Sequence, residues 1–361
     1  MKVESIVRRV ADLGNPDSLR GLSDPYGIAI RSSDVISAYK SNPSLANDEC
    51  PAELLGVADG KIFAGVGFMP IRILADGSEY ETSANPNTQV AAEYRKTGFA
   101  LDILQFAIDC PRDRIRLDFY VSPSARKAIK LYGGVVFDIR QFAMVKKSSL
   151  FLKGRLNFPA WIRNMVCIGL DALMFFHRAF VGLITMVRTI GWRMSMADDD
   201  ENLNRFAELI SEDTHRFKVM EDVAFLKWLL ANDFCGKNVA QKHLWKVEKR
   251  GDLIGYVMMR QDGEGRGRII DWQIVKGKES LLARMLLFAS KKLIKTTKAV
   301  VVSVSATDLD LVKSFRHLLL PLPMQAATLG ADDGSPLRKH VGWEDANNWR
   351  IRPTMGDSGL Y

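Results

Sequence analysis

Apolar and polar positions alternate in short runs along the first part of the chain, and turn residues separate these runs. Apolar runs lie on both sides of Asp59-Gly60, and a second turn, Asp76-Gly77, precedes the run Tyr80-Glu81-Thr82. Asp-Gly between two apolar runs favours a β-hairpin. The pattern therefore predicts an antiparallel meander over residues 53–82, preceded by a short helix at residues 33–40.

The meander leads into residues 90–104, where an apolar run ends, a basic turn follows and an amphipathic helical pattern begins. This order presents backbone N–H groups at a helix N-terminus, which attracts phosphate. Arg95 and Lys96 add positive charge beside Gly98, which has no side chain to obstruct a ligand. These residues alone are equally compatible with a phosphate cradle and with an ordinary loop-to-helix junction.

The elements that follow are a helix ending at Cys110-Pro111, an alternating strand at residues 114–121 and a helix ending at Gly133-Gly134. In this order, Arg-x-x-Gly-x-Ala at residues 95–100 and Ala-x-x-Leu-Tyr at residues 128–132 resemble the GNAT superfamily of acyl-CoA-dependent N-acyltransferases. The resemblance covers residues 25–148. It departs from the family at Ala125, where an asparagine is common.

The resemblance implies an acyl-CoA site built from backbone N–H groups. Those at the end of the strand before the turn would polarise the thioester carbonyl, and those of the turn would hold the pyrophosphate. The implied cofactor-binding residues are Val90, Ala91, Arg95, Lys96, Thr97, Gly98, Phe99, Ala100 and Ser124. No metal is implied.

Two residues are candidates for proton transfer. Tyr132 matches the family's general acid, a hydroxyl near the CoA sulfur, although a helix-terminal aromatic in the core is an equal alternative. Glu81 is the candidate base, directly or through water, with Glu79 as the second choice. An exposed strand carboxylate is the alternative for Glu81.

Residues 151–196 change character, because a long apolar stretch carries few charges, and these are mostly basic. On a helix, Arg163, Asp171, Arg178 and Thr185 share one narrow face, and large apolar residues cover the rest. The uncharged runs on either side of His177-Arg178 are too short for a membrane span. Two interpretations remain: a helix buried between domains, or a basic amphipathic segment on an anionic membrane surface. The acidic residues 198–201 predict a solvated break after it.

The second half repeats the order hairpin, strand, helix, strand, helix between residues 244 and 320. It resembles a degenerate GNAT-like domain. Its turn, residues 275–280, lacks the Arg-x-x-Gly-x-Ala signature, and Glu279 there opposes a phosphate. We therefore expect no CoA in the second copy. The tandem arrangement, with Trp349 near the end, resembles bacterial GNAT-type proteins linked to polysaccharide assembly.

The composition of the chain limits the classes of binding partner that are expected. The chain has 361 residues, 47% of them hydrophobic, and a net charge of +8, so it is globular and favours anionic partners. Nothing matches a nucleic-acid module. The four cysteines and five histidines show no metal-ligand spacing. The N-terminus lacks a secretory hydrophobic core, which predicts a cytoplasmic protein, with peripheral contact to the inner face of the membrane through residues 151–196.

The sequence thus predicts an α+β protein with two GNAT-like domains, each a mixed, mostly antiparallel sheet flanked by helices. The predicted segments are residues 1–150 (acyl-CoA binding), 151–196 (a basic amphipathic helical linker) and 197–361 (the degenerate domain). The predicted activity is acetyl-CoA-dependent N-acyl transfer to an amine, such as an amino sugar or polysaccharide precursor. A non-catalytic acyl-CoA-binding or membrane-surface adaptor is the alternative.

Overall fold

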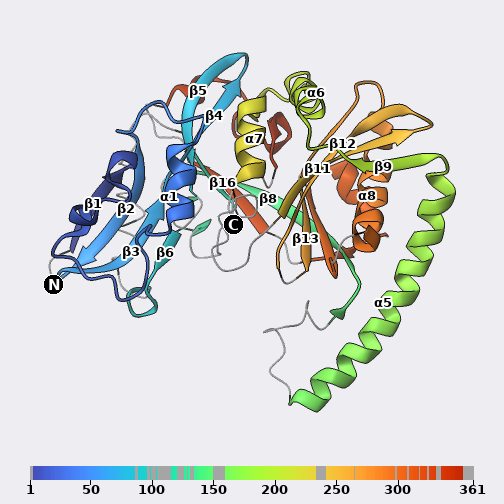
Figure 1. Ribbon diagram of the computed structural model, residues 1–361, viewed down its shortest axis with the longest axis horizontal. Coiled ribbons are helices and arrows are strands. Elements are labelled where there is room, and N and C mark those ends of the chain that lie inside the picture. The colour runs from blue at the N-terminus through green and yellow to red at the C-terminus, as the bar shows by residue number, and fades with distance from the viewer. Residues whose placement is uncertain are drawn as a thin grey trace. The chain divides into compact units, whose positions relative to one another are not determined.

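The structure is a computed structural model with helices and sheets in two compact units (Figure 1). It describes residues 3–85, 88–95, 98, 103, 115–119, 126–127, 129–130, 134–148, 159–232, 241–263, 265–296, 299–306, 309–316, 318–322, 325–330 and 335–352. Unit 1 comprises Met1–Asp138, Thr214–Gly236 and Gln325–Tyr361, and unit 2 comprises Ile139–Asp213 and Lys237–Met324.

Unit 1 contains two sheets. The first has the strand order β1-β2-β3-β6, formed by Val3–Arg9, Pro51–Ala58, Lys61–Gly67 and Thr88–Val90. The second has the order β17-β10-β4-β5-β7-β16, formed by Trp349–Arg350, Phe217–Val219, Met69–Ala75, Ser78–Ala84, Ile115–Phe119 and Gln325–Gly330. The helices of unit 1 include α1 (Ser33–Lys40) and α7 (Val223–Ala231).

Segments from the second half of the sequence complete the second sheet of unit 1. Strand β10 pairs antiparallel with β4, β17 pairs parallel with β10, and β16 pairs antiparallel with β7. The indole of Trp228 on α7 also donates a hydrogen bond to the carbonyl of Ala38 on α1, at 3.0 Å. Each compact unit is therefore built from several separate stretches of the chain. The predicted segments are consecutive stretches (residues 1–150, 151–196 and 197–361), and as domains they stay a prediction.

Unit 2 holds the sheet β8-β14-β13-β12-β11-β9. Its strands are Val135–Val145 (which enters unit 2 at Ile139), Val301–Ala306, Arg266–Ile274, Asp252–Gln261, Gln241–Lys249 and Trp192–Met196, and β15 (Leu320–Pro321) pairs with β8. Helices α5 (Ala160–Arg188), α6 (Asp200–Ser211), α8 (Leu282–Thr296) and α9 (Leu309–Phe315) accompany it. Residues 241–315 thus follow the predicted order of hairpin, strand, helix, strand and helix.

Turn chemistry determines the hairpins. The loops β2–β3, β4–β5 and β11–β12 each place a residue and the glycine after it at positive φ: Asp59-Gly60, Asp76-Gly77 and Arg250-Gly251. Two consecutive residues at positive φ are typical of a type I′ turn, whose twist matches that of the two strands. The predicted hairpins are confirmed.

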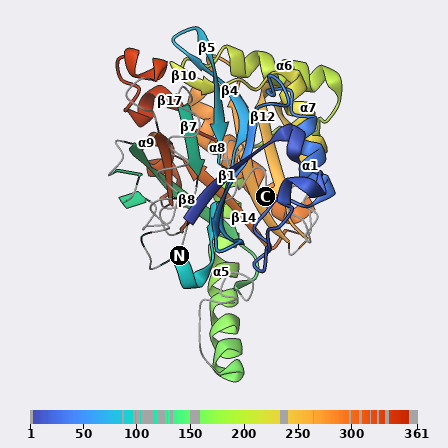
Figure 2. The ribbon, with the colours of Figure 1, turned by 90° about the vertical axis from the view of Figure 1, so that its left-hand side faces the viewer.

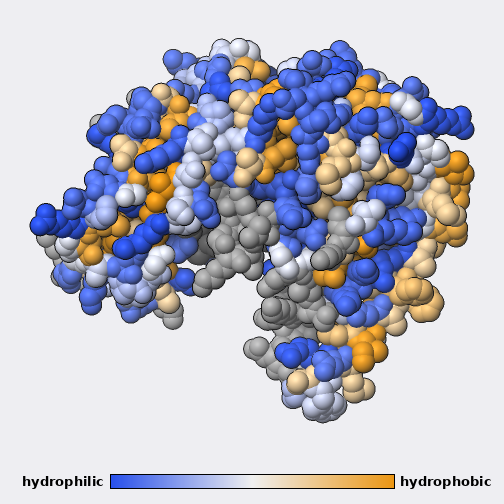
Figure 3. Space-filling model, viewed as in Figure 1, coloured by the Kyte–Doolittle hydropathy of each residue, from blue (hydrophilic) through white to orange (hydrophobic). Residues whose placement is uncertain are grey.

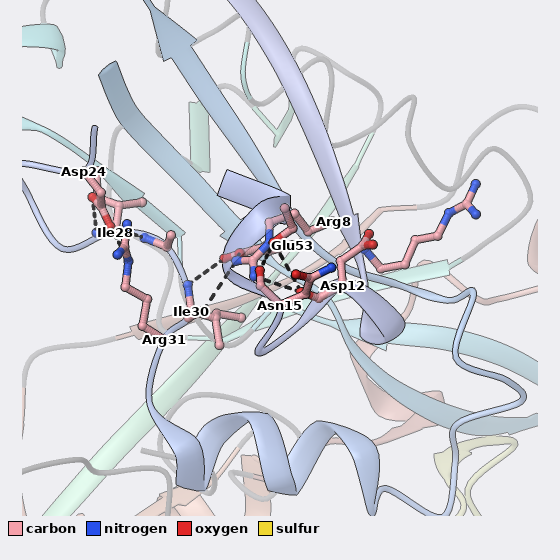
Figure 4. Close-up of polar contacts among 11 residues, drawn as sticks. Arg8, Asp12, Asn15, Asp24, Ile28, Ile30, Arg31 and Glu53 are labelled. Atoms are coloured by element: carbon pink, nitrogen blue, oxygen red, sulfur yellow. Dashed lines mark hydrogen bonds and ion pairs between the residues drawn. The ribbon is translucent and has the colours of Figure 1, made fainter. Parts of the chain in front are cut away.

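Buried and half-buried ionic contacts hold the start of the chain on the first sheet (Figure 4). Arg8 on β1 pairs with Glu53 on β2, and both side chains are buried. The other oxygen of Glu53 accepts the N–H of Ile30 at 2.9 Å. Burial raises the pKa of Glu53 despite its arginine partner. Glu53 therefore ties residues 24–30 to the sheet, and Asp24 closes a turn within that segment by accepting the N–H of Ile28 at 2.9 Å.

The predicted solvated break at residues 198–201 comprises the exposed residues 198–199 between β9 and α6, and it also contains the start of that helix. Asp199 is the N-cap of α6 and accepts the N–H of Asn202 at 3.0 Å. Asp200 and Glu201 follow in the first turn. Carboxylates at this end satisfy free N–H groups and favour the positive end of the helix dipole. The acidic run is therefore a capping signal.

The β4–β5 turn provides a test of acid stability. Asp76 accepts hydrogen bonds from Arg216 at 2.6 and 2.7 Å and from Nδ1 of His340 at 2.8 Å. Hydrogen bonds from Arg216, then from His340, lower the pKa of Asp76 to about 2. A carboxyl with a lowered pKa stabilises the fold above its unfolded pKa of 3.8, and this contribution disappears as the pH falls toward 2.

We expect Asp76→Asn to lower the free energy of unfolding near neutral pH, and the difference from the wild type to vanish as the pH falls below about 2, because Asp76 is then protonated and both side chains are uncharged. Asparagine tolerates the positive φ of this position, which isolates the effect of charge. Urea denaturation of both proteins across this pH range measures the difference. A difference that stays constant with pH would show that the Asp76 charge is not its source.

Candidate functional site

The two sheets of unit 1 separate between two consecutive strands, β5 and β6. Residues Thr82–Ala84 of β5 pair in parallel with β7, and the N–H of Asn85 donates to Leu117 of β7 at 3.0 Å. Three residues later, β6 pairs with β3 in the other sheet. The chain therefore leaves one sheet and joins the other directly before the basic turn.

The register of β6 on β3 directs the two candidate carbonyl-polarising amides in opposite directions. The N–H of Ala91 donates to Phe63 of β3 at 2.8 Å, whereas Val90 lies opposite Ala64. Hydrogen-bonded and non-bonded pairs alternate in an antiparallel ladder, so the N–H of Val90 points away from β3. β6 is the last strand of its sheet, so this N–H lies along an edge. Of the two predicted donors, the structure favours Val90, since Ala91 is already bonded.

The turn after β6 holds a cation next to this edge. Residues Ala92–Tyr94 form one 3-10 turn, and the Tyr94 ring stacks on Phe63 of β3 at a centroid distance of 4.6 Å. Arg95 follows, and its Nε donates to the carbonyl of Val90 at 2.8 Å. This bond holds the exposed guanidinium beside β6, and among the described residues its terminal nitrogens have no hydrogen-bond partner, so they can meet an anion. The predicted role of Arg95 is thus compatible with its position.

Gly98 is exposed, and its backbone lies outside the positive-φ region. A Cβ placed on it would have no described atom within 4 Å. Neither conformation nor packing in the described part of the chain requires glycine here, and the open space is compatible with a ligand. Four other predicted cofactor residues of this turn, Lys96, Thr97, Phe99 and Ala100, lie outside the described residues, as does Ser124.

The candidate proton-transfer groups are Tyr132 and Glu81. Tyr132 lies outside the described residues. Glu81 is exposed on β5 opposite Arg72, nine residues before Val90. Both stay predictions. Glu79 accepts a hydrogen bond from Arg72 at 3.1 Å.

Two hydroxyls on β5 were not anticipated. Thr82 and Ser83 are buried at the end of the strand that pairs with β7, and their hydroxyl oxygens have no hydrogen-bond partner among the described residues. A buried polar group without a partner favours a water or a ligand. The signal in the sequence is the polar pair Thr82-Ser83 before Ala84, at the end of a strand whose first four residues are exposed or half-buried.

In the corresponding turn of unit 2, the carboxylate of Glu279 takes the place where a phosphate would bind. After β13, Gly277 adopts φ +83°, and its N–H donates to the carboxylate of Glu279 at 2.8 Å. Hydrogen bonds from the backbone N–H groups of Glu279 and Gly277 lower the pKa of Glu279. The nitrogen that would meet a phosphate is thus occupied by a side chain of the same turn.

The described residues include no group of three or more His, Cys, Asp or Glu side chains arranged to hold a metal ion. Cys50 and Cys167 are buried free thiols. The group implied by the sequence resemblance is an acyl-CoA, and the described residues fit it through the edge amide of Val90, the guanidinium of Arg95 and the open space at Gly98.

No protein-family model matches the sequence, and no curated protein matches it. Solved structures do match. Saccharomyces cerevisiae N-myristoyltransferase with bound myristoyl-CoA aligns with a TM-score of 0.54 at 10% identity, covering 91% of this chain and 83% of its own. A tandem GNAT protein from the clavulanic acid biosynthesis pathway gives 0.51 at 11% identity, covering 91% and 98%.

A third structure, a probable N-acyltransferase of unknown function from Enterococcus faecalis, gives a TM-score of 0.51 at 9% identity and covers 92% of this chain and 73% of its own. At these identities the likeness concerns the fold. The predicted fold class, mixed sheets flanked by helices in the GNAT arrangement with a tandem protein among the similar structures, is confirmed.

Proposed function

We propose that this chain, whose fold is that of the GNAT N-acyltransferases, transfers an acyl group from CoA to an amine. The observation that carries the proposal is the edge amide of Val90, directed away from β3 where the two sheets of unit 1 separate. Arg95 is hydrogen-bonded to the same residue. A donor for a developing oxyanion thus lies beside a cation for a diphosphate.

The reaction needs three contributions, and the described residues account for two. Acyl-CoA supplies an activated thioester. The N–H of Val90 stabilises negative charge on the carbonyl oxygen as the amine attacks, and Arg95 with the turn through Gly98 binds the diphosphate. The amine must lose a proton and the departing thiolate gains one. Tyr132 and Glu81 stay predictions for these steps, with Glu81 acting directly or through water.

The test is release of free CoA thiol from acyl-CoA in the presence of amines. Myristoyl-CoA belongs in the panel beside acetyl-CoA, because the similar structures include an N-myristoyltransferase with bound myristoyl-CoA. Amino sugars and polysaccharide precursors are the first acceptors to test, because the tandem arrangement suggests them. Thiol release that depends on an amine supports the proposal. Failure of the protein to bind CoA at all contradicts it.

A non-catalytic acyl-CoA-binding protein is the second candidate. The observation that favours it is that the contacts at Val90 and Arg95 serve binding of the carbonyl and the diphosphate and need no proton-transfer group. Thermal unfolding distinguishes the two. A CoA-dependent rise in midpoint without acylation of any amine in the panel would favour the binding protein.

We expect one CoA to bind per chain. The turn of unit 2 already donates its Gly277 N–H to Glu279, and the carboxylate would repel a second phosphate. Isothermal titration calorimetry with CoA measures the stoichiometry. A value of two would show that the turn of unit 2 also binds the ligand.

A further inference from the structure

Helix α5 of unit 2 turns the charged residues of its middle, Asp171 and Arg178, toward the protein. The N–H of Ser148 donates to the Asp171 carboxylate at 2.5 Å. Arg178 donates to the carbonyls of Val145 and Lys146, at 2.6 and 3.0 Å. These partners follow or end β8 in the same unit. The polar face predicted from the sequence is therefore the face that contacts unit 2.

The opposite side of α5 is apolar and exposed. Ten of the fifteen large hydrophobic side chains that the described residues expose lie on this one helix. Among them are Trp161, Met165, Phe175, Phe176, Phe180 and Leu183, each between 59% and 69% exposed; we call this side the outer face. In Figure 3 apolar residues follow the outer side of the helix along its length, and Figure 2 shows its first turns extending past the strands of unit 2.

This polarity is the reverse of that of a helix on a water-soluble surface, which directs its polar side to solvent. At about 100° per residue, the outer-face residues and the protein-facing residues occupy opposite halves of the helix. Contiguous apolar patches of this kind mark interaction sites. Within unit 2, only 11% of the most apolar window of α5 is buried.

The charges identify the occupant. Arg163, Arg188 and Arg193 are exposed at the two ends of the apolar stretch, and the single acidic residue of α5 is Asp171, which faces Ser148. A second copy paired antiparallel along α5 would bring the basic ends together without an acidic residue to offset them. An anionic lipid surface provides both the apolar layer and the negative charge.

The helix is also long and apolar enough to span a bilayer, at 29 residues or about 43 Å. Spanning would move Asp171 and Arg178, near its middle, into the hydrocarbon and would break their bonds to Ser148 and Val145. Lying in the plane of the interface leaves these bonds intact. It lets arginines at the ends reach the headgroups.

We propose that α5 docks this protein on an anionic membrane surface, lying in the interface plane with its outer face in the lipid. The surface belongs to unit 2 and does not depend on the proposed acyl transfer. Loss of membrane binding and loss of CoA binding are therefore separable results.

Flotation of the full chain with vesicles tests the proposal. Vesicles of phosphatidylcholine and phosphatidylglycerol in a ratio of about 3:1 should carry the wild type upward, and pure phosphatidylcholine should carry much less. Phe175→Ser, Phe176→Ser and Phe180→Ser combined should reduce binding about tenfold or more, since each exposed ring contributes apolar area to the lipid contact. An equal number of exposed apolar residues elsewhere, in Val7→Ser, Met196→Ser and Val341→Ser, is the matched control and should leave binding unchanged.

The charge contribution is tested with Arg163→Gln, Arg188→Gln and Arg193→Gln. Each basic residue near an anionic surface contributes about fivefold, so the triple variant should bind up to about a hundredfold more weakly. Arg20→Gln, Lys40→Gln and Lys61→Gln remove the same charge from exposed positions in unit 1 and should have little effect.

Three results would overturn the proposal. Equal flotation of the serine variant and the wild type would exclude the outer face as the lipid contact. Wild-type protein that stays with membranes in alkaline carbonate would show a spanning helix. The third result is a wild-type protein that does not bind vesicles but forms a dimer, which the serine substitutions abolish. This result would identify a second copy of the chain as the partner of the outer face.

Discussion

A Gly98→Glu protein should bind CoA at least about a hundredfold more weakly than the wild type, because a carboxylate would stand where the diphosphate is expected. The change should leave folding intact. No described atom lies within 4 Å of the new Cβ, and the backbone does not adopt positive φ. Calorimetric titration with CoA measures the affinity, and thiol release measures the activity, which should fall in parallel.

Gly263 provides the matched control. It is also exposed, has no described atom within 4 Å of a Cβ, and lies outside the positive-φ region. Gly263→Glu should therefore bind CoA as the wild type does. If the two glutamate variants bound CoA equally well, the turn after β6 would not be the diphosphate site, whatever the activity of the protein.

Arg350→Met should lower the free energy of unfolding by about 3–5 kcal/mol, because it leaves a buried carboxylate without its partner. Arg350 on β17 donates to Glu221 at 2.8 Å, and both side chains are completely buried. β17 in turn pairs with β10, which pairs with β4. Urea denaturation measures the loss, and we expect unit 1 to be the part that unfolds first.

Two variants separate this effect from the general cost of losing an arginine. Arg205→Met removes an exposed arginine paired with Glu208 on one face of α6, and it should cost at most about 1 kcal/mol. Arg350→Met combined with Glu221→Leu should recover much of the stability, because no unpaired charge remains buried. If the single and double variants were equally unstable, the loss of packing rather than of charge pairing would be responsible.

Local chemistry made the hairpins and several helices predictable. Asp59-Gly60 and Asp76-Gly77 form the turns that their types favour, and α1 spans the expected residues 33–40. Elements whose signal is weak were missed. β10 has three residues and β17 has two, and strands this short form because their partners are already in place.

The candidate site was predictable as a motif but not as a geometry. The sequence identified residues 90–100 as one unit, and the order of elements around them suggested the fold. Which amide is available depends on the pairing of Val90 with Ala64, a contact between strands that lie 26 residues apart. A shift by one residue would exchange the roles of Val90 and Ala91.

The sequence by itself determined the turn types, the GNAT-like order of elements and the existence of two faces on α5, because these depend on neighbouring residues and on periodicity. Only the tertiary structure decided that β10, β16 and β17 complete the second sheet of unit 1, and that the polar face of α5 is the one turned inward. Periodicity shows that a helix has two faces. Which face packs on unit 2 is decided by two hydrogen bonds, from the Ser148 N–H to Asp171 and from Arg178 to the Val145 carbonyl. The apolar face is left for another partner.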